Sequence, residues 1–229
     1  MKTIGLLGGM SWESTALYYR LINEETKRRQ GGLHSAPIAM VSVDFQPIEA
    51  LQHRGEWDAM AEILAEKGRR IEAAGADMLL ICTNTMHKVA PEVQAAIDIP
   101  LLHLADATAA AIVADGRSKI GLLGTRFTME QEFYKGRLAE HGLEVLVPEP
   151  EDIEIVHKVI YEELCMGNVV DASRAEYLRI INNLHATGTE GVIAGCTEIG
   201  MLVKPEHTDV PIYDTTIIHA MHAVTEALK

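Results

Sequence analysis

The chain has 229 residues, 48% of them hydrophobic and 23% charged, which is the composition of an ordinary globular protein. Acidic residues (33) outnumber basic ones (20), so the formal net charge is −13. A negative chain without a long lysine or arginine run is poorly suited to nucleic acid or to an anionic membrane surface. No apolar run approaches the ~18 residues of a membrane span, and no cleavable leader is visible. We therefore expect a cytoplasmic globular protein that binds neither nucleic acid nor membranes.

Short apolar runs alternate with longer segments of helical periodicity, which is typical of β-α units around parallel sheets. In chain order, strands are expected at 3–7, 39–43, 77–81, 101–104, 119–123, 144–146, 191–194 and 211–213. Helices are expected at 14–29, 57–73, 129–141, 152–166 and 172–187. The alternation predicts an α/β fold with right-handed crossovers.

The two halves of the chain share a repeated pattern. The sequence Ile-Gly-Leu-Leu-Gly occurs at 4–8 and again at 120–124, and the segment 75–83 is similar to 188–196. Further on, Pro-Leu-Leu at 100–102 parallels Pro-Ile-Tyr at 211–213. We expect two similar domains, the first of residues 1–105 plus 211–229 and the second of residues 106–210, each contributing strand ends to a shared cleft.

Two cysteines occupy matching places in these halves. Cys82 and Cys196 each close a buried strand and begin a polar segment, at the strand end where open α/β sheets bind ligands. Cys165 lies in an apolar-periodic stretch and is expected in the core. Two weak acids facing each other can remove a proton from one face of a carbon and return one to the other. The cysteine spacing fits neither a disulfide framework nor a zinc site, so no metal is expected.

A glycine-rich turn follows the first predicted strand. Gly8 and Gly9 precede Ser11, and backbone N–H groups in such a turn can hold a carboxylate. The alternative is a tight turn in which Ser11 or Ser14 caps the following helix.

These motifs resemble the cofactor-independent aspartate/glutamate racemases along essentially the whole chain. The matching stretches are 4–10, 13–15, 18–23, 82–87, 121–125 and 195–198. Among them, the chain is most similar to bacterial L-aspartate/glutamate-specific or broad-specificity amino-acid racemases. The resemblance implies two pseudo-symmetric three-layer α/β domains with mainly parallel sheets and an active site in the cleft between them. It further implies an amino-acid substrate, two facing cysteines as acid and base, no pyridoxal phosphate, and a homodimer.

The sequence departs from the family pattern at one of these cysteines. The family has Cys directly before Asn-Thr-x-His, whereas here Thr83 precedes Asn84 and Cys82 lies one residue earlier. Counting from the helix-end glycines Gly75 and Gly188 matches Thr83 with Cys196, while the Cys-Thr dipeptide matches Cys82 with it. Neighbours on an extended strand point to opposite faces, so only one of the two can face the cleft. We favour Thr83 and keep Cys82 as the alternative.

The expected catalytic groups are thus Cys196 as base and Thr83 on the other face. We expect Cys196 to be activated by a nearby helix N-terminus or by polar neighbours, because a free thiol of pKa ~8.5 is mostly protonated at neutral pH. The predicted substrate-binding residues are Met10, Ser11, Gln52, Asn84, Thr85, Thr125, Thr197 and Glu198. Gln52, Arg54 or Arg126 are candidates to bind a side-chain carboxylate.

Other activities share this pattern of residues. A broad-specificity racemase of neutral amino acids, a hydantoin racemase, a maleate isomerase and a malonate decarboxylase are the enzymatic alternatives. A non-catalytic ligand-binding relative, marked by Thr83, is the alternative of a different class.

Overall fold

The computed structural model describes residues 1–229, which form two compact units. The first unit is Met1–Leu104 with His219–Lys229, and the second is Ala105–Ile218. We expected 211–218 in the first unit, but β7 (Ile212–Asp214) pairs with β6 (Val192–Gly195) in the sheet of the second. The boundary therefore falls inside the helix α11 (Thr215–Ala227) and not before β7.

The first unit is built on a parallel sheet of β1 (Ile4–Gly8), β2 (Ile38–Ser42) and β3 (Met78–Ile81), in the order β2-β1-β3. Every residue of β1 and β3 is buried, as expected for strands covered by helices on both faces. The strand predicted at 101–104 is reduced to one bridge between Leu79 and Leu101, because Leu104 already begins α5 (Leu104–Ala114).

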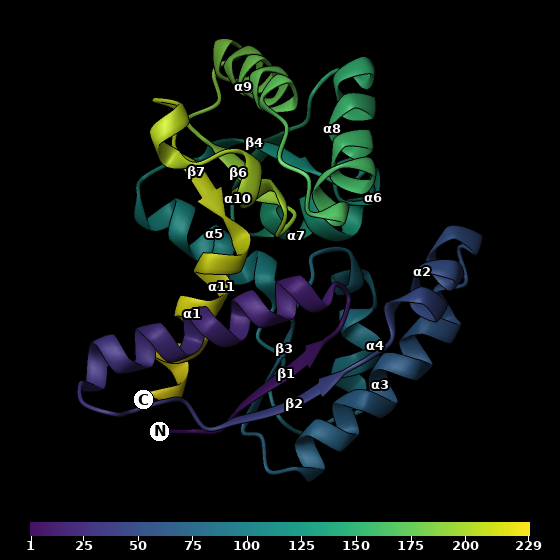
Figure 1. Cartoon of the computed structure of the whole chain (residues 1–229), viewed down its shortest axis with the longest axis vertical. Helices are drawn as coiled ribbons and strands as arrows, with labels where there is room; N and C mark the ends of the chain where they lie inside the picture. Colours follow the sequence, from purple (N-terminus) through teal and green to yellow (C-terminus); the bar gives the residue numbers. More distant parts are fainter. The chain divides into compact units, whose positions relative to one another are not determined.

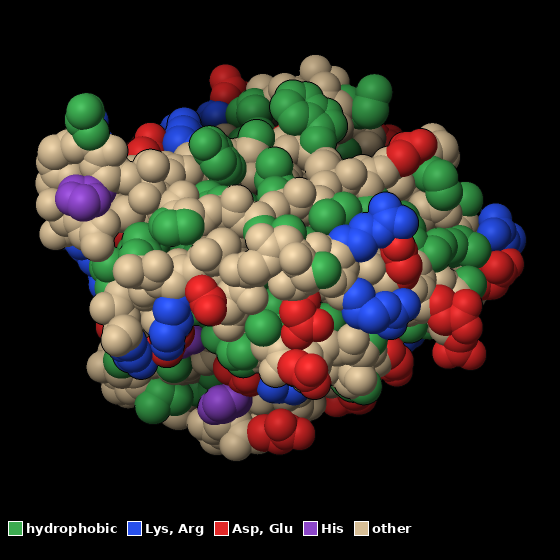
Figure 2. Space-filling view, turned by 90° about the horizontal axis from the view of Figure 1, so that it is seen from below, with side chains coloured by type: hydrophobic (Ala, Val, Ile, Leu, Met, Phe, Trp, Pro, Cys, Tyr) green, Lys and Arg blue, Asp and Glu red, His purple; other side chains and the backbone are tan.

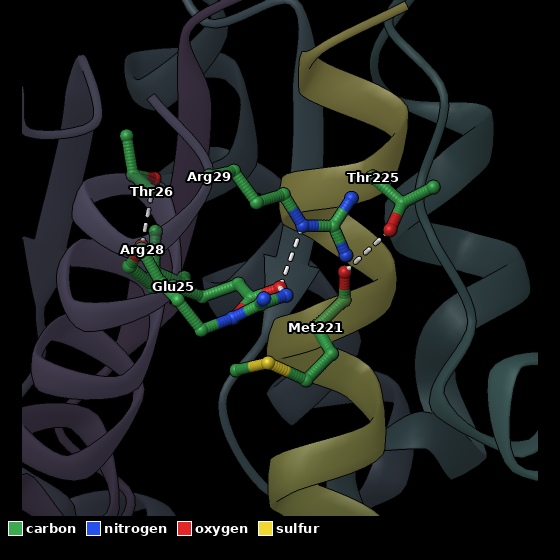
Figure 3. Close-up of polar contacts among 7 residues, drawn as sticks. Glu25, Thr26, Arg28, Arg29, Met221 and Thr225 are labelled. Atoms are coloured by element: carbon green, nitrogen blue, oxygen red, sulfur yellow. Dashed lines mark hydrogen bonds and ion pairs between the residues drawn. The ribbon is translucent and has the colours of Figure 1, made fainter. Parts of the chain in front are cut away.

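Helices cover both faces of this sheet (Figure 1). One face packs against α2 (Phe45–Arg54), α3 (Trp57–Ala73), the 3₁₀ helix η1 (Thr85–Val89) and α4 (Ala90–Ala95). The other packs against α1 (Trp12–Gln30) and α11, where Tyr18 and Val224 are fully buried. In Figure 3, Glu25 of α1 receives a hydrogen bond from Arg29 beside Met221 and Thr225 of α11. The first unit thus has three layers, and its last helix comes from far along the chain.

The second unit has a parallel sheet in the order β5-β4-β6-β7. Its remaining elements are β4 (Lys119–Gly124), α6 (Arg126–Glu130), α7 (Glu132–Glu140), β5 (Glu144–Leu146), α8 (Pro150–Glu162), η2 (Leu164–Met166), α9 (Asp171–Ala186), α10 (Ile199–Leu202) and η3 (Pro205–His207). Two parallel sheets with helical layers confirm the predicted α/β class.

Two helix predictions in the second unit need correction. The helix expected at 129–141 is two helices, because Gln131 between them is extended (φ −88°, ψ 148°). The helix expected at 152–166 starts at Pro150 and ends at Glu162, and the 3₁₀ turn η2 follows. Cys165 lies in this turn and is exposed, so the expectation that it belongs to the core is wrong.

On the face shown in Figure 2, acidic and basic side chains are interspersed, without a continuous basic patch. No helix has both the length and the apolar character needed to span a bilayer.

Candidate active site

The first group of predicted site residues follows the adjacent strands β1 and β3. Leu7 pairs with Ile81, so the segments after both strands leave the same edge of the sheet. Gly9, which follows β1, has a φ of 95°, and a Cβ on it would overlap the Val43 backbone. Only glycine suits this turn. The hydroxyl of Ser11 then accepts a hydrogen bond from the Ser14 amide (3.3 Å), so Ser11 is the N-cap of α1.

The register of the two sheets decides which residue corresponds to Cys196. The second residue of the repeated Ile-Gly-Leu-Leu-Gly pairs with Leu79 in the first sheet and with Val192 in the second. The strand pairing is otherwise the same in the two sheets, so Leu79 and Val192 occupy equivalent places. The residues four positions after them are therefore equivalent as well. These residues are Thr83 and Cys196.

Burial agrees with this register. Thr83 and Cys196 are both half-buried, and each stands among buried neighbours. Cys82 has no exposed surface and belongs to the core cluster under α1 and α11. Burial alone raises the pKa of the Cys82 thiol far above its usual range, which keeps this thiol protonated.

The other predicted residues of the first unit lie beside this strand edge or in α2. Asn84 and Thr85 are buried where η1 begins, Met10 is buried after β1, and Gln52 is buried in α2. Arg54 is exposed, and its Nε donates to Glu56 Oε1 at 2.5 Å.

The second group follows β4 and β6, whose ends are paired at Gly124 and Gly195. Thr125 is the N-cap of α6, and its hydroxyl accepts a hydrogen bond from the Thr128 amide (3.4 Å). Arg126, next to it, is ion-paired with Glu154.

Cys196, Thr197 and Glu198 form a compact polar cluster in the second unit. The Cys196 thiol donates to Glu198 Oε2 at 2.8 Å, and the Thr197 hydroxyl donates to the same oxygen at 2.7 Å. Thr197 and Glu198 are buried. The Glu198 carboxylate is therefore a hydrogen-bond partner of the thiol, whereas we expected Glu198 among the substrate-binding residues.

The polar neighbour of the Cys196 thiol is an acidic group, Glu198. Burial raises the pKa of this thiol well above the usual range, and the negative charge of Glu198 raises it further. The helix α10 after it has only four residues. Of the two activating features that we expected, the helix N-terminus belongs to a single turn, and the polar neighbour is a carboxylate that accepts the hydrogen bond of the thiol.

Two further side chains hold the backbone around Thr83. The Ser14 hydroxyl donates to the Cys82 carbonyl at 2.8 Å, and His87 Nδ1 lies 2.8 Å from the Thr83 carbonyl oxygen. The sequence offers one signal for the second contact, the four-residue spacing between Thr83 and His87. The contact from Ser14 spans 68 positions and has no local signal.

The geometry provides groups for proton transfer in both units: a thiol with an adjacent carboxylate in one, and a half-buried hydroxyl at the equivalent position in the other. The structure contains no cluster of three or more histidine, cysteine or acidic side chains arranged to hold a metal ion.

Comparison with known proteins identifies relatives over the full chain. The family model described as Asp/Glu/Hydantoin racemase matches residues 7–223. The broad specificity amino-acid racemase RacX of Bacillus subtilis (strain 168) is 21% identical over 233 residues, covering 98% of each chain. Among solved structures, a candidate Asp/Glu racemase from Yersinia pestis is 53% identical, with a TM-score of 0.95. An aspartate racemase homologue from Pyrococcus horikoshii OT3 is 34% identical, with a TM-score of 0.87, and both matches cover 100% of each chain.

Proposed function

Because the chain belongs to the Asp/Glu/hydantoin racemase family, we propose that it is a cofactor-independent amino-acid racemase acting on aspartate or glutamate. The observation that carries the proposal is the shared sheet register, which makes Thr83 and Cys196 equivalent residues of the two units. Both are half-buried, so each keeps some surface for a substrate.

In the proposed reaction, Cys196 removes the α-proton of the L-enantiomer. Its thiol first passes its own proton to Glu198, to which it is already hydrogen-bonded. The pair carries one negative charge before and after this transfer, so the thiolate forms without a net change of charge in a buried place.

The carbanion is then protonated on its other face by the Thr83 hydroxyl. This step gives the D-enantiomer and leaves Thr83 as an alkoxide. Water returns a proton to Thr83, and the protonated Glu198 gives its proton to the hydroxide that remains, which restores the starting state. The α-carboxylate needs hydrogen-bond donors that stabilise the developing enediolate, and the backbone amides after β1, β3 and β6 are the proposed donors. The remaining predicted binding residues are proposed to bind the substrate beside these amides; they are Met10, Ser11, Gln52, Asn84, Thr85, Thr125 and Thr197.

One observation favours a second candidate, a racemase of broader specificity. Both arginines that the sequence offered for a side-chain carboxylate are ion-paired with glutamates, Arg54 with Glu56 and Arg126 with Glu154. An arginine already neutralised in this way selects an acidic side chain less strongly. RacX is similar to this chain over its whole length and is described as a broad specificity racemase.

The test is exchange of the α-proton in D₂O, followed by NMR over a panel of acidic and neutral L-amino acids. Exchange with inversion on aspartate and glutamate alone supports the first candidate, and exchange across neutral substrates supports the second. Cys196→Ser should lower the rate at least ~10²-fold, because a serine hydroxyl is a far weaker acid than a thiol. Cys165→Ser, at an exposed position, is the matched control. An equal loss of racemisation rate in the two variants, with both still folded, would contradict the assignment of Cys196. If the protein were instead a malonate decarboxylase, it would release carbon dioxide.

We further propose that the enzyme is a cytoplasmic homodimer. The three cysteines form no disulfide, which suits a reducing compartment, and the dimer rests on the family resemblance. Sedimentation equilibrium of the purified protein tests the oligomeric state.

A further inference from the structure

His87 is buried in the first unit with both ring nitrogens engaged by main-chain groups. Nδ1 lies 2.8 Å from the Thr83 carbonyl oxygen, and the Leu104 amide donates to Nε2 at 3.2 Å. A carbonyl can only accept and an amide N–H can only donate. Nδ1 must therefore carry the proton and Nε2 must lack one, which fixes His87 as the neutral Nδ1–H tautomer.

A second buried histidine supports the segment that contacts His87. His219 Nε2 donates to the Leu102 carbonyl at 2.8 Å, so its Nδ1 is the acceptor for the Tyr18 hydroxyl at 2.9 Å. Burial lowers the pKa of His219 to about 3, so this ring is neutral as well. The rings of His87 and His219 meet edge to face with centroids 5.9 Å apart. Segment 102–104 is thereby held from two sides.

The Ser14 and His87 contacts fall on the two peptide groups that flank Thr83. Ser14 binds the Cys82 carbonyl, in the peptide group before the Thr83 Cα (2.8 Å). His87 binds the Thr83 carbonyl, in the peptide group after that Cα (2.8 Å). Fixing both peptide planes fixes φ and ψ of Thr83, and with them the direction in which its Cβ and hydroxyl project. In the second unit, the equivalent carbonyl of Cys196 accepts a backbone N–H, from Ile199 at 3.1 Å. At this carbonyl, a side chain contacts Thr83 where a backbone group contacts Cys196.

We propose that Ser14 and neutral His87 are positioning residues that aim the Thr83 hydroxyl at the substrate carbanion. The inference rests on the proposed racemase function. A hydroxyl is a weaker acid than a thiol, so protonation by Thr83 competes poorly with return of the proton from Cys196. A displacement of about 1 Å can cost ~10²-fold in such a step. The two contacts therefore determine how the carbanion divides between the D-product and the regenerated L-enantiomer.

Two substitutions of His87 separate its two contacts. His87→Asn places an amide N–H where Nδ1 stands and keeps the bond to Thr83, whereas His87→Gln places a carbonyl where Nε2 stands and keeps only the bond to Leu104. In D₂O, deuterium in the recovered L-substrate measures proton removal and return by Cys196 alone. Formation of the D-product also requires protonation by Thr83. We expect His87→Gln to lower the ratio of D-product to exchanged L-substrate at least about tenfold, and His87→Asn to leave it near the wild-type value. Ser14→Ala should lower the ratio in the same direction.

His185→Gln is the matched control, because His185 Nδ1 makes the same kind of contact with the Thr189 carbonyl (2.6 Å) in the second unit. It should leave the ratio unchanged. If His87→Gln lowered D-product and exchanged L-substrate by the same factor, the role of His87 would be merely structural and the inference would be overturned. It would also be overturned by ¹⁵N NMR of the wild-type protein showing the proton of His87 on Nε2, a measurement that needs no turnover. Absence of any exchange by the wild-type enzyme, with the Nδ1–H tautomer observed, would instead refute the proposed racemase function.

Discussion

At the scale of single residues, the proposed chemistry depends on Cys196, a thiol whose pKa is raised by burial and by Glu198. Glu198 accepts the Cys196 hydrogen bond at 2.8 Å and, through its negative charge, disfavours the thiolate. The same carboxylate is the nearest acceptor for the proton that the thiol must lose. A poor resting base and a ready proton acceptor are two consequences of one contact.

The Glu198→Gln variant separates these two effects. Removing the carboxylate charge should lower the pKa of Cys196, although burial, the larger cause, keeps it above the usual value. The pH profile of Cys196 alkylation by iodoacetamide, followed by mass spectrometry, should therefore move to lower pH. Racemisation should nevertheless fall at least about tenfold, because the amide cannot take the proton. Glu206→Gln, at an exposed carboxylate of the same unit, is the control. A profile that stays or moves to higher pH would refute the role given to Glu198.

A second residue-scale prediction concerns Thr83 and its buried neighbour. Thr83→Cys gives the D-substrate a thiol base, so initial rates at saturating D-substrate should rise about tenfold or more. Progress curves in the two directions should become more alike, because each direction then has a thiol as its base. Cys82→Ala removes a core side chain with no exposed surface and should cost roughly 1 kcal/mol of stability with little loss of turnover. Loss of the reaction in Cys82→Ala, with Thr83→Ala still active, would show that the assigned register is wrong.

At the scale of elements, the sequence predicts most strands and the helices α1, α3, α8 and α9, because apolar period and helix-end glycines are local signals. The helices α2, α5 and α11 lie outside the predicted ranges. The helix at 57–73 is found at its predicted bounds, and the repeat placed Thr83 in register with Cys196. A helix break that depends on the conformation of one residue leaves no such periodic signal in the sequence. The extended Gln131 interrupts a run whose periodicity continues on both sides. The Cys196–Glu198 hydrogen bond was also missed. The two residues are two positions apart in a tight turn, and this spacing does not show in which direction the Glu198 carboxylate points.

The contribution of α11 to the first unit gives an element-scale prediction. Val224 of α11 is fully buried beneath the sheet, whereas Val113 of α5 is half-exposed. Val224→Ala should lower the free energy of unfolding by about 1–3 kcal/mol through lost burial and a residual cavity. Val113→Ala should change it by less than about 0.5 kcal/mol. Urea unfolding of both variants, followed by circular dichroism, provides the comparison; equal destabilisation would refute the core role of α11.

At the scale of the whole molecule, the two units repeat one another in details that motif matching does not show. In each, a carboxylate ahead of one strand (β3 or β6) binds the backbone where the neighbouring inner strand (β1 or β4) begins. Asp77 accepts from the Thr3 amide at 2.6 Å, and Glu190 accepts from the Lys119 amide at 2.9 Å. The repeated framework holds a thiol in one unit and a hydroxyl in the other. The two units thus keep the same sheet register around different side chains, Cys196 in one and Thr83 in the other.

The whole enzyme should work without pyridoxal phosphate. The proposed chemistry uses a thiol, a carboxylate and a hydroxyl, and no residue is assigned to form an imine. Dialysis against hydroxylamine, which strips carbonyl cofactors, should leave racemisation unchanged. A visible absorbance band in the purified protein whose removal abolishes turnover would contradict this.

The path of the chain between units has a consequence for the order of events during synthesis. Residues 1–104 emerge from the ribosome first, yet the core that they form also contains Ala220, Ala223 and Val224 of α11. His219, which secures the Leu102 carbonyl, arrives equally late. The second unit has all of its residues from 105 to 218 available before then. Nascent chains should consequently acquire a protease-resistant second unit before the first, the reverse of the usual N-terminal-first sequence.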